Sequence, residues 1–222
     1  MKTTVISLGG SLLEGNYAKK FAQSLEPFLS KTKFAIVTGG GKNAGQYAEA
    51  ARLKTGSEFW ADEAAIKATR ENAEELVAAF GKNSWPHVLT YPSQVVEALK
   101  KKKVAVSGGF LPGNTTDACA VLLAEALGEK RVVNVSKVDG IYDQDPKKFK
   151  NAKRFDTLTH AQLLQLATRF DDRKARTNFL FDVVAAKLCA RSSIEVDFVS
   201  GLDLYQVAAA IQGKAFSGTK VR

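Results

Sequence analysis

The sequence predicts an α/β fold in which helices cover both faces of a mostly parallel sheet. Short apolar runs of strand length alternate with helical patterns along the chain. Several of these runs end in glycine-rich turns, which are typical of strand-to-helix junctions. No internal repeat or interdomain linker interrupts the alternation, so we expect a single domain over residues 1–222.

The strand candidates are short runs rich in apolar residues. They are residues 4–8, 34–38, 104–107, 132–135 and 195–199, with 88–90 as a weaker candidate. Helical patterns fill the intervals, at residues 17–29, 43–54, 63–80, 93–100, 116–127, 160–168, 179–191 and 204–211. The polar, basic stretch 143–156, which contains Pro146, is predicted to be a loop.

The composition is that of a chain that buries a full core and carries no membrane segment. Hydrophobic residues make up 45% of the 222 residues. The longest apolar run, residues 118–124, is far shorter than a membrane span, and the apolar stretch near residue 4 is too short for a signal peptide. Cys119 and Cys189 lie in helix-like apolar contexts, so buried thiols are favoured over a disulfide or a metal site. We therefore expect a cytoplasmic protein with no membrane partner.

The charge balance favours anionic ligands. Lys and Arg number 32 against 23 Asp and Glu, a net charge of +9. Such a surface could attract nucleic acid, acidic lipid or nucleotides. The run of lysines at residues 100–103 is interpreted as a solvated helix end that suits the helix dipole. No interleaving of aromatic and basic residues is present, so a nucleic-acid partner is not expected.

Three glycine-rich turns follow predicted strands and indicate a phosphate site. They are Gly9-Gly10-Ser11, Gly39-Gly40-Gly41-Lys42, and Gly108-Gly109 leading into residues 112–117. Ligands of open α/β sheets bind where strands end, and glycine lets backbone N–H groups approach phosphate closely. Each turn alone could be a structural necessity, but three in one basic chain favour a polyphosphate ligand. None matches a Walker A loop or a dinucleotide-binding fingerprint.

Further polar clusters leave structural alternatives open. Ser136, Lys137, Tyr142 and Asp145 follow a strand and could meet a nucleotide, or simply form an acidic turn closed by Asp-Pro. Asp182 interrupts an apolar stretch, either as a satisfied core group or as the organiser of a site.

Asp62, Thr69 and Asn72 can share one face of a predicted helix, together with Arg70 on the same helix. From spacing alone, a solvated helix face is the preferred interpretation. His87 and His160 have no partner pattern, and no Ser-His-Asp or Cys-His arrangement is present. The inventory suits phosphoryl transfer, where positioning and electrostatics do most of the catalysis.

The ordered set of motifs resembles the archaeal-type uridylate (UMP) kinases of the amino acid kinase superfamily. The resemblance spans nearly the whole chain, and the P-G-x-T-T-D-A segment points to the UMP kinase branch. The matching segments are residues 7–11, 37–42, 69–73, 108–118, 137–148 and 185–192.

This resemblance implies a three-layer αβα sandwich, the amino acid kinase fold, with acceptor binding in residues 1–130 and ATP binding in residues 131–222. It implies ATP- and Mg²⁺-dependent phosphorylation of UMP to UDP by a homohexamer. It implies ATP contacts at Gly10, Ser11, Gly41, Ser136, Lys137, Tyr142 and Asp145. It implies UMP contacts at Gly40, Asp62, Leu111, Pro112, Gly113, Asn114, Thr115, Thr116 and Asp117. Asp117 and Asp182 would orient groups around the metal, and no dedicated metal site in the protein is expected.

Two positions depart from the family pattern. Gly45 stands where an arginine is usual, and Ser7 stands where related kinases carry a lysine. We therefore expect phosphate-neutralising charge from Lys42, Arg70 or Lys137, with Lys42 as the catalytic candidate; alternatively, its side chain simply reaches water. Two alternatives to a UMP kinase remain: a kinase of another small phosphate or carboxylate acceptor, and a non-catalytic oligomer that binds nucleotides or other anions.

Overall fold

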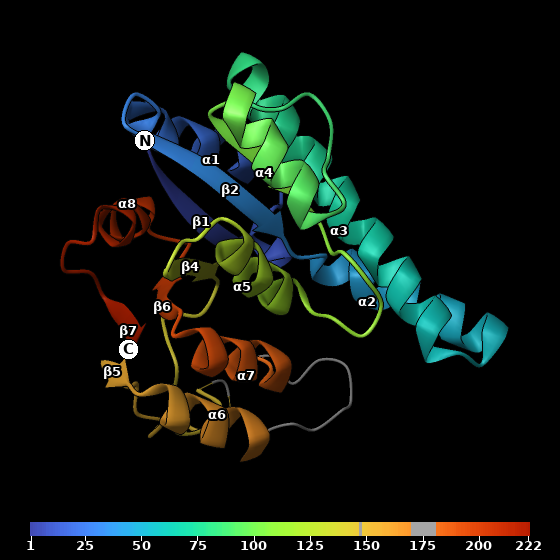
Figure 1. The fold of residues 1–222 in the computed structure, drawn as a ribbon. Helices are drawn as coiled ribbons and strands as arrows, with labels where there is room; N and C mark the ends of the chain where they lie inside the picture. Colours follow the sequence, from blue (N-terminus) through green and yellow to red (C-terminus); the bar gives the residue numbers. More distant parts are fainter. Residues whose placement is uncertain (147, 170–180) are drawn as a thin grey trace.

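A single seven-stranded sheet organises the molecule (Figure 1). In this computed structural model the described residues are 1–146, 148–169 and 181–222. The sheet order is β3-β2-β1-β4-β6-β7-β5, and each neighbouring pair is parallel except β6 with β7. The strands are β1 (Lys2–Leu8), β2 (Thr32–Thr38), β3 (Val104–Ser107), β4 (Arg131–Ser136), β5 (Thr157–Leu158), β6 (Glu195–Ser200) and β7 (Gly218–Val221).

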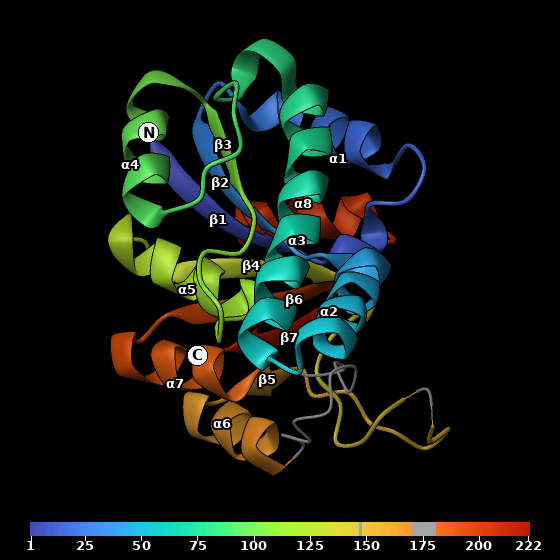
Figure 2. The same ribbon diagram turned by 90° about the vertical axis from the view of Figure 1, so that its right-hand side faces the viewer.

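Helices cover both faces of the sheet, which confirms the predicted αβα sandwich. The α-helices are α1 (Tyr17–Leu25), α2 (Gly41–Thr55), α3 (Glu58–Phe80), α4 (Pro92–Lys101), α5 (Thr116–Ala126), α6 (His160–Arg169), α7 (Val183–Ser192) and α8 (Leu204–Gln212). Adjacent residues of β1 face opposite layers: Val5 packs in a core with α4, α5, α6 and α7, whereas Ile6 packs with α1, α3 and α8. Figure 2 shows α4 and α5 to the left of the strands and α1 and α3 to the right.

The predicted strands and helices are confirmed with small shifts at their ends. The weak candidate at residues 88–90 is not a strand, because Leu89 makes only an isolated bridge to Ser107. The helix expected from residue 179 begins at Val183, since the Asp182 side chain caps its first turn; residues 179–180 lie outside the described residues. β5 and β7 were not predicted, because both are short and one begins with a glycine.

One pair of helices extends beyond the sandwich. α2 buries none of its residues and packs along the 23-residue α3, whose N-terminal end reaches past the sheet (Figure 1). The predicted loop at 143–156 is irregular in its described residues, except that Arg154 forms an isolated β-bridge with Tyr142. Lys147 lies outside the described residues. No helix of the described residues is long and apolar enough to cross a membrane.

Candidate active site

The turns after β1 and β2 meet backbone to backbone at the carboxyl ends of the strands. The Gly39 N–H donates to the Leu8 carbonyl over 2.8 Å, which ties the second turn to the end of β1. A Cβ on Gly10 would lie 2.1 Å from the Gly39 carbonyl oxygen, and Gly41 adopts φ +59°. Only glycine permits this approach. The result is a close pairing of two turns in which Gly10 and Gly39 place no side chain between the two backbones.

Helix α3 braces these turns from one side. The Asn72 side chain donates to the Gly39 carbonyl (2.7 Å), and the Gly109 N–H donates to the Thr69 hydroxyl (2.7 Å). Thr38 in turn donates to the Thr69 carbonyl (2.7 Å). Thr69 and Asn72 are buried, so the interpretation of this helix face as solvated is wrong. Their polar groups fix the carboxyl ends of β2 and β3, and the glycine turns that follow them, against α3.

Asp117 lies at the centre of the polar cluster. Its Oδ1 accepts hydrogen bonds from the Ser7 hydroxyl and the Asn134 amide, each over 2.7 Å. Burial raises the pKa of the Asp117 carboxyl to about 6, and the neighbouring Asp182 charge also raises it. The residue as a whole is half-buried. Ser7 is thus a donor to this carboxylate.

Asn134 was missed by the sequence analysis. It is a polar residue within the apolar run of β4, and it is buried at 8% exposure. An amide at such a position needs a partner, and this need was the available signal. The partner could not be read from the sequence, because Asp117 lies on a different element.

Asp182 connects α7 to residues 109–117, which are called the acceptor segment below. Its carboxylate accepts the Ala185 N–H (3.0 Å) and the Thr115 hydroxyl, while Thr115 itself accepts the Ala118 N–H (3.1 Å). The two side chains therefore cap α7 and α5 and are bonded to each other. This arrangement fits both interpretations of Asp182, a satisfied structural carboxylate and an organiser of the site.

The acceptor segment, residues 109–117, is held by α3. The Gly113 N–H donates to Asp62 Oδ2 over 2.8 Å, and Gly113 adopts φ +81°. Arg70 Nη2 donates to the carbonyls of Gly109 (3.2 Å) and Phe110 (3.4 Å). The Arg70 Nε atom is buried and has no hydrogen-bond partner among the described residues. The structure thus brings Asp62, predicted as a UMP contact, to the predicted segment that contains Leu111, Pro112, Gly113, Asn114, Thr115 and Thr116.

The predicted ATP contacts lie at the ends of β4 and in the following loop. Ser136 is adjacent to the first glycine turn, because a Cβ on Gly9 would lie 3.6 Å from the Ser136 Cβ. The Lys137 ammonium pairs with Glu14 over 3.3 Å, and both side chains are largely exposed. The Asp145 carbonyl accepts the Lys148 N–H over 3.0 Å and closes the turn after it.

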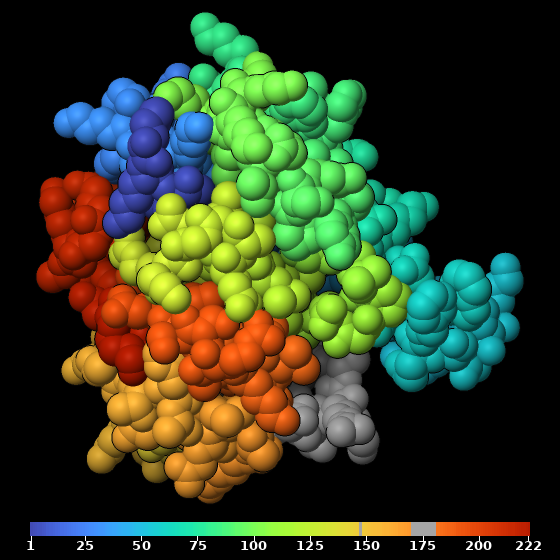
Figure 3. Space-filling view, in the orientation of Figure 1, coloured from blue at the N-terminus to red at the C-terminus, as the bar shows by residue number. Residues whose placement is uncertain are grey.

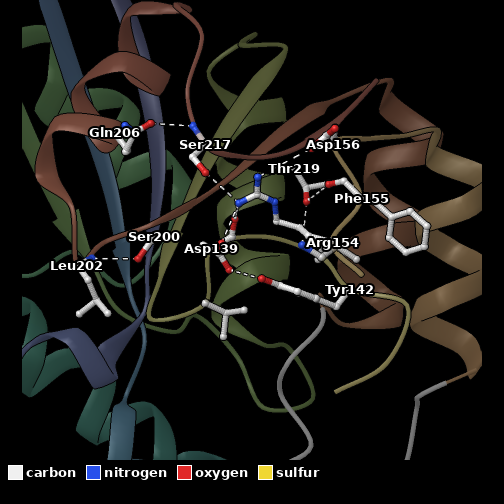
Figure 4. A network of polar contacts seen from close by, with 12 residues as sticks. Asp139, Tyr142, Arg154, Phe155, Asp156, Ser200, Leu202, Gln206, Ser217 and Thr219 are labelled. Atoms are coloured by element: carbon white, nitrogen blue, oxygen red, sulfur yellow. Dashed lines mark hydrogen bonds and ion pairs between the residues drawn. The ribbon is translucent and has the colours of Figure 1, made fainter. Parts of the chain in front are cut away.

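A network of side chains holds the loop that carries Tyr142 (Figure 4). The Tyr142 hydroxyl donates to Asp139 over 2.7 Å, and Arg154 bonds both Asp139 (2.8 Å) and the Ser217 hydroxyl (2.9 Å). Burial, followed by the Asp139 hydrogen bond, raises the pKa of Tyr142. Arg154 and Ser217 were not predicted, since they are far apart in sequence and belong to no local motif.

Lys42 occupies the first turn of α2, next to Gly41. Its side chain is exposed, and no partner is recorded for it in the part of the chain that the structure describes. A cation at a helix N-terminus is unfavourable unless an anion is near. The geometry leaves Lys42 available to a ligand at the paired glycine turns.

The carboxylates of the cluster offer few ligands to Mg²⁺. Among the described residues, no group of three or more His, Cys, Asp or Glu side chains could hold a metal ion. Asp117 and Asp182 are close enough for the Asp182 charge to raise the Asp117 pKa. Mg²⁺ in kinases is held by one or two carboxylates together with substrate phosphates. The residues therefore fit a metal that arrives with the nucleotide.

Comparison with known proteins shows which chains and folds this protein is similar to. The amino acid kinase family model matches residues 2–198. Uridylate kinase from Thermococcus kodakarensis is 39% identical over 222 residues, covering 98% of both chains. Uridylate kinase from Methanospirillum hungatei is 37% identical, covering 100% of this chain and 95% of its own. The crystal structure of uridylate kinase from Archaeoglobus fulgidus superimposes with a TM-score of 0.87 at 34% identity, covering 100% of each chain.

Proposed function

This chain belongs to the amino acid kinase family, and on that premise we propose that it is a UMP kinase that transfers the γ-phosphoryl group of ATP to UMP, giving ADP and UDP. One observation carries the proposal: full-length similarity, at 34–39% identity, to proteins named uridylate kinase. The two joined glycine turns support it, because a phosphate can approach backbone that carries no side chain at Gly10 and Gly39.

The acceptor phosphate of UMP is already anionic, so no strong general base is required. The chain instead has to align two mutually repelling anions for in-line transfer. Gly10, Ser11 and Gly41 would face the ATP phosphates, and Gly40 would face the UMP phosphate. Asp62, already bonded to Gly113, would accept ribose hydroxyls while it shapes the acceptor segment. Mg²⁺ bound with ATP would supply charge neutralisation, and Asp117 and Asp182 would orient donors or water around it.

Three cations could replace the charges that the family pattern implies at the positions of Gly45 and Ser7. Lys137 is paired with Glu14, and Arg70 is bonded to two carbonyl groups of the acceptor segment. Lys42 alone among these three has no recorded partner in the described residues. We assign Lys42 to the developing charge on the transferred phosphoryl group, and Arg70 to the position of the acceptor segment.

The proposed contacts to the two substrates come from different parts of the sheet. The acceptor contacts come from residues 1–130, whereas Ser136, Lys137, Tyr142 and Asp145 belong to residues 131–222. The two halves share one sheet through the β1–β4 pairing, so both substrates would meet across that junction. The two buried free thiols, Cys119 and Cys189, are what we expect of a cytoplasmic enzyme.

The end of the α2–α3 pair supports a homo-oligomer, a hexamer by the family resemblance. Leu53 is 83% exposed, and Phe59 and Trp60 are 53% and 55% exposed on a part of the surface that stands clear of the body (Figure 3). Contact with a second copy would bury these side chains. Light scattering after size-exclusion chromatography should show an oligomer that Trp60→Lys weakens; a monomeric parent protein would contradict this assignment.

A coupled ADP-release assay tests the proposed function. UMP, CMP, dUMP, isopentenyl phosphate and acetylglutamate are compared as acceptors with Mg-ATP. We expect the highest kcat/KM for UMP. Turnover of isopentenyl phosphate or acetylglutamate without UMP would assign another acceptor, and nucleotide binding without any turnover would assign a non-catalytic role.

A further inference from the structure

The turn after β6 lies at the same end of the sheet as the candidate active site, although none of the sequence motifs includes it. β6 runs parallel to β4 with Ser200 opposite Ser136, so the two strands end side by side. The Gly201 N–H donates to the Ser136 carbonyl over 2.7 Å. The Leu202 N–H donates back to the Ser200 hydroxyl over 3.3 Å and closes the turn (Figure 4). The turn is thus attached to Ser136, a proposed ATP contact.

Tyr17, at the start of α1, holds this turn from the other side. Its hydroxyl donates to the Gly201 carbonyl over 2.7 Å and is the one donor to that carbonyl among the described residues. The Tyr17 ring stacks on Phe21 with the ring centroids 6.0 Å apart, which fixes the direction of the hydroxyl. Burial raises the pKa of Tyr17, so the hydroxyl keeps its proton and can donate. Gly201 is therefore bonded to β4 through its N–H and to α1 through its carbonyl.

The space around Gly201 is closed by the segment that leads from the first glycine turn to α1. A Cβ on Gly201 would lie 2.4 Å from Leu12 Cδ1 and 2.7 Å from the Tyr17 hydroxyl oxygen. Leu12 is buried and ends the 3₁₀ turn that begins at Gly10. Leu12 and Tyr17 thus both contact Gly201, and a residue without a side chain is needed between them.

Backbone hydrogen bonds make this segment a continuous series of tight turns. The Leu12 N–H donates to the Gly9 carbonyl over 2.9 Å. The Glu14 N–H donates to the Leu12 carbonyl over 2.8 Å, and the Tyr17 N–H donates to the Glu14 carbonyl over 3.4 Å. A contact that fixes Tyr17 therefore also restrains the first glycine turn.

A second contact joins the same two parts of the site but is more exposed. Lys137 and Glu14 pair over 3.3 Å, with side chains that are 44% and 71% exposed. Ion pairs between exposed side chains contribute little, because water screens them and both side chains lose freedom. The hydroxyl of Tyr17, which is half-buried, is the stronger candidate for holding the first glycine turn near the end of β4.

We propose that Tyr17 is a positioning residue for ATP. Through Gly201, its hydroxyl sets the distance between the first glycine turn and the end of β4. The inference rests on the proposed function, in which Gly10, Ser11 and Ser136 contact ATP. A group that holds two binding segments at the right distance improves binding by preorganisation, without touching the ligand.

The UMP side does not depend on this contact. Asn72 of α3 holds the second glycine turn through the Gly39 carbonyl, and Asp62 of the same helix holds the acceptor segment. Loss of the Tyr17 hydroxyl should therefore weaken the binding of ATP and leave the binding of UMP unchanged.

Tyr17→Phe tests the proposal, because it removes the hydroxyl and keeps the ring that stacks on Phe21. Isothermal titration of the full chain with Mg²⁺ and a non-hydrolysable ATP analogue gives the Kd. We expect the Kd and the KM for ATP to rise about five-fold, as the loss of one hydrogen bond would cause, with the KM for UMP unchanged. A variant with a lower melting temperature and the parent Kd would show a merely structural role and overturn the proposal.

Tyr205→Phe is the matched control. It makes the same chemical change on α8, next to the turn after β6. Tyr205 is 78% exposed, and its hydroxyl has no partner in the part of the chain that the structure describes. This variant should keep the parent Kd. Equal weakening in both tyrosine variants would overturn the proposal.

A double-mutant cycle tests whether Tyr17 acts through Gly201. Gly201→Ala places a methyl group against Leu12 and Tyr17, so it should weaken binding of the ATP analogue by itself. In Tyr17→Phe/Gly201→Ala the two losses should be less than additive, because both changes act on one contact. Fully additive losses would contradict a path through Gly201. If Gly201→Ala does not fold, the Tyr17→Phe titration decides the proposal.

These measurements separate the role of Tyr17 from the proposed function. A parent protein that binds the ATP analogue but phosphorylates no UMP would contradict the proposed function, and the comparison of Kd values would still test Tyr17. An unchanged Kd in Tyr17→Phe, with UMP phosphorylated normally, would overturn the role of Tyr17 alone. A parent protein that does not bind the analogue would overturn both.

Discussion

The two sides of the candidate active site are built in different ways. Residues 1–130 carry the acceptor contacts and are called the acceptor side here, although their glycine turns would also face the ATP phosphates. On this side the glycine turns pack backbone against backbone, and buried groups of α3, among them Thr69 and Asn72, hold them in place. On the ATP side, the loop after β4 is held by half-exposed side chains centred on Arg154 and Asp139. Buried hydrogen bonds and close backbone contacts tolerate almost no change, whereas partly solvated ion pairs contribute little individually. We therefore expect substitutions on the acceptor side to be the more damaging.

Lys42→Met should have the largest effect. Lys42 directly follows the Gly39-Gly40-Gly41 turn, is exposed, and has no partner among the described residues. Loss of one preorganised charge should reduce kcat by roughly 10²–10³. Both KM values and the melting temperature should change little, because the charge acts on the transition state. Lys54→Met, near the end of the same helix, is the control. A Lys42→Met enzyme within a few-fold of the parent kcat would shift this role to Arg70 or Lys137.

Gly10→Ala probes the backbone contact itself. Its Cβ would lie 2.1 Å from the Gly39 carbonyl oxygen, so the two turns must separate. A displacement of about 1 Å at the reacting groups should reduce kcat/KM by about 10²-fold. Gly56→Ala is the control, since it has open space and φ +66° and adds only backbone strain. Steady-state kinetics with equal losses in both variants would show that the close contact is not important.

Asp117→Asn separates stability from activity. Because burial raises the Asp117 pKa to about 6 in the folded protein, the folded state binds this proton more tightly than the unfolded state does. Stability from this group is therefore present at low pH and is lost as the pH rises through the interval from about 4 to about 6, by up to about 3 kcal/mol. At pH 7.5 we expect the variant to melt at the same or a higher temperature and to lose activity. A strongly destabilised variant in thermal melts at that pH would contradict the assignment.

The pH profile of the parent enzyme also tests whether activity requires the ionised Asp117 carboxylate. Activity should fall as the pH drops through about 6, where the Asp117 carboxylate becomes protonated. This limb should be missing from the residual activity of Asp117→Asn.

Asp62→Ala tests whether the acceptor side binds UMP selectively. A hydrogen bond to a charged group contributes about 1.5–3 kcal/mol, so the KM for UMP should rise by about ten-fold or more. The KM for ATP should stay nearly constant, because Asp62 contacts the acceptor segment through Gly113. Glu63→Ala, exposed on the next position of α3, is the control. Equal changes in both KM values would return Asp62 to a purely structural role.

Arg154→Gln should have the smallest effect and so sharpens the contrast. The guanidinium group bonds Asp139 and Ser217, and its loss loosens the loop that carries Tyr142. We expect a rise of a few-fold in the KM for ATP, equivalent to about 1 kcal/mol, with the KM for UMP unchanged. A loss as large as that of Gly10→Ala would show that the ATP side is no more tolerant than the acceptor side.

The sequence alone determined most of the secondary structure of this protein through local patterns. Alternating apolar runs and helical periods predicted five strands and the helices, and glycine pairs marked where the strands end. These features depend on residues close together in the chain, because backbone conformation and side-chain period are local properties. The ordered motifs also predicted the family, which the comparisons confirmed.

The tertiary structure alone decided which distant groups meet. Ser7 and Asp117 are 110 residues apart and become hydrogen-bonded only because β1 lies in the sheet beneath α5. Whether Thr69 faces water or the glycine turns depends on how α3 packs, and the sequence pattern fits both. Lys33 and Lys82 converge for the same reason, since strand pairing brings their segments to one edge. Sheet order and helix packing set these contacts, and no local period in the sequence encodes them.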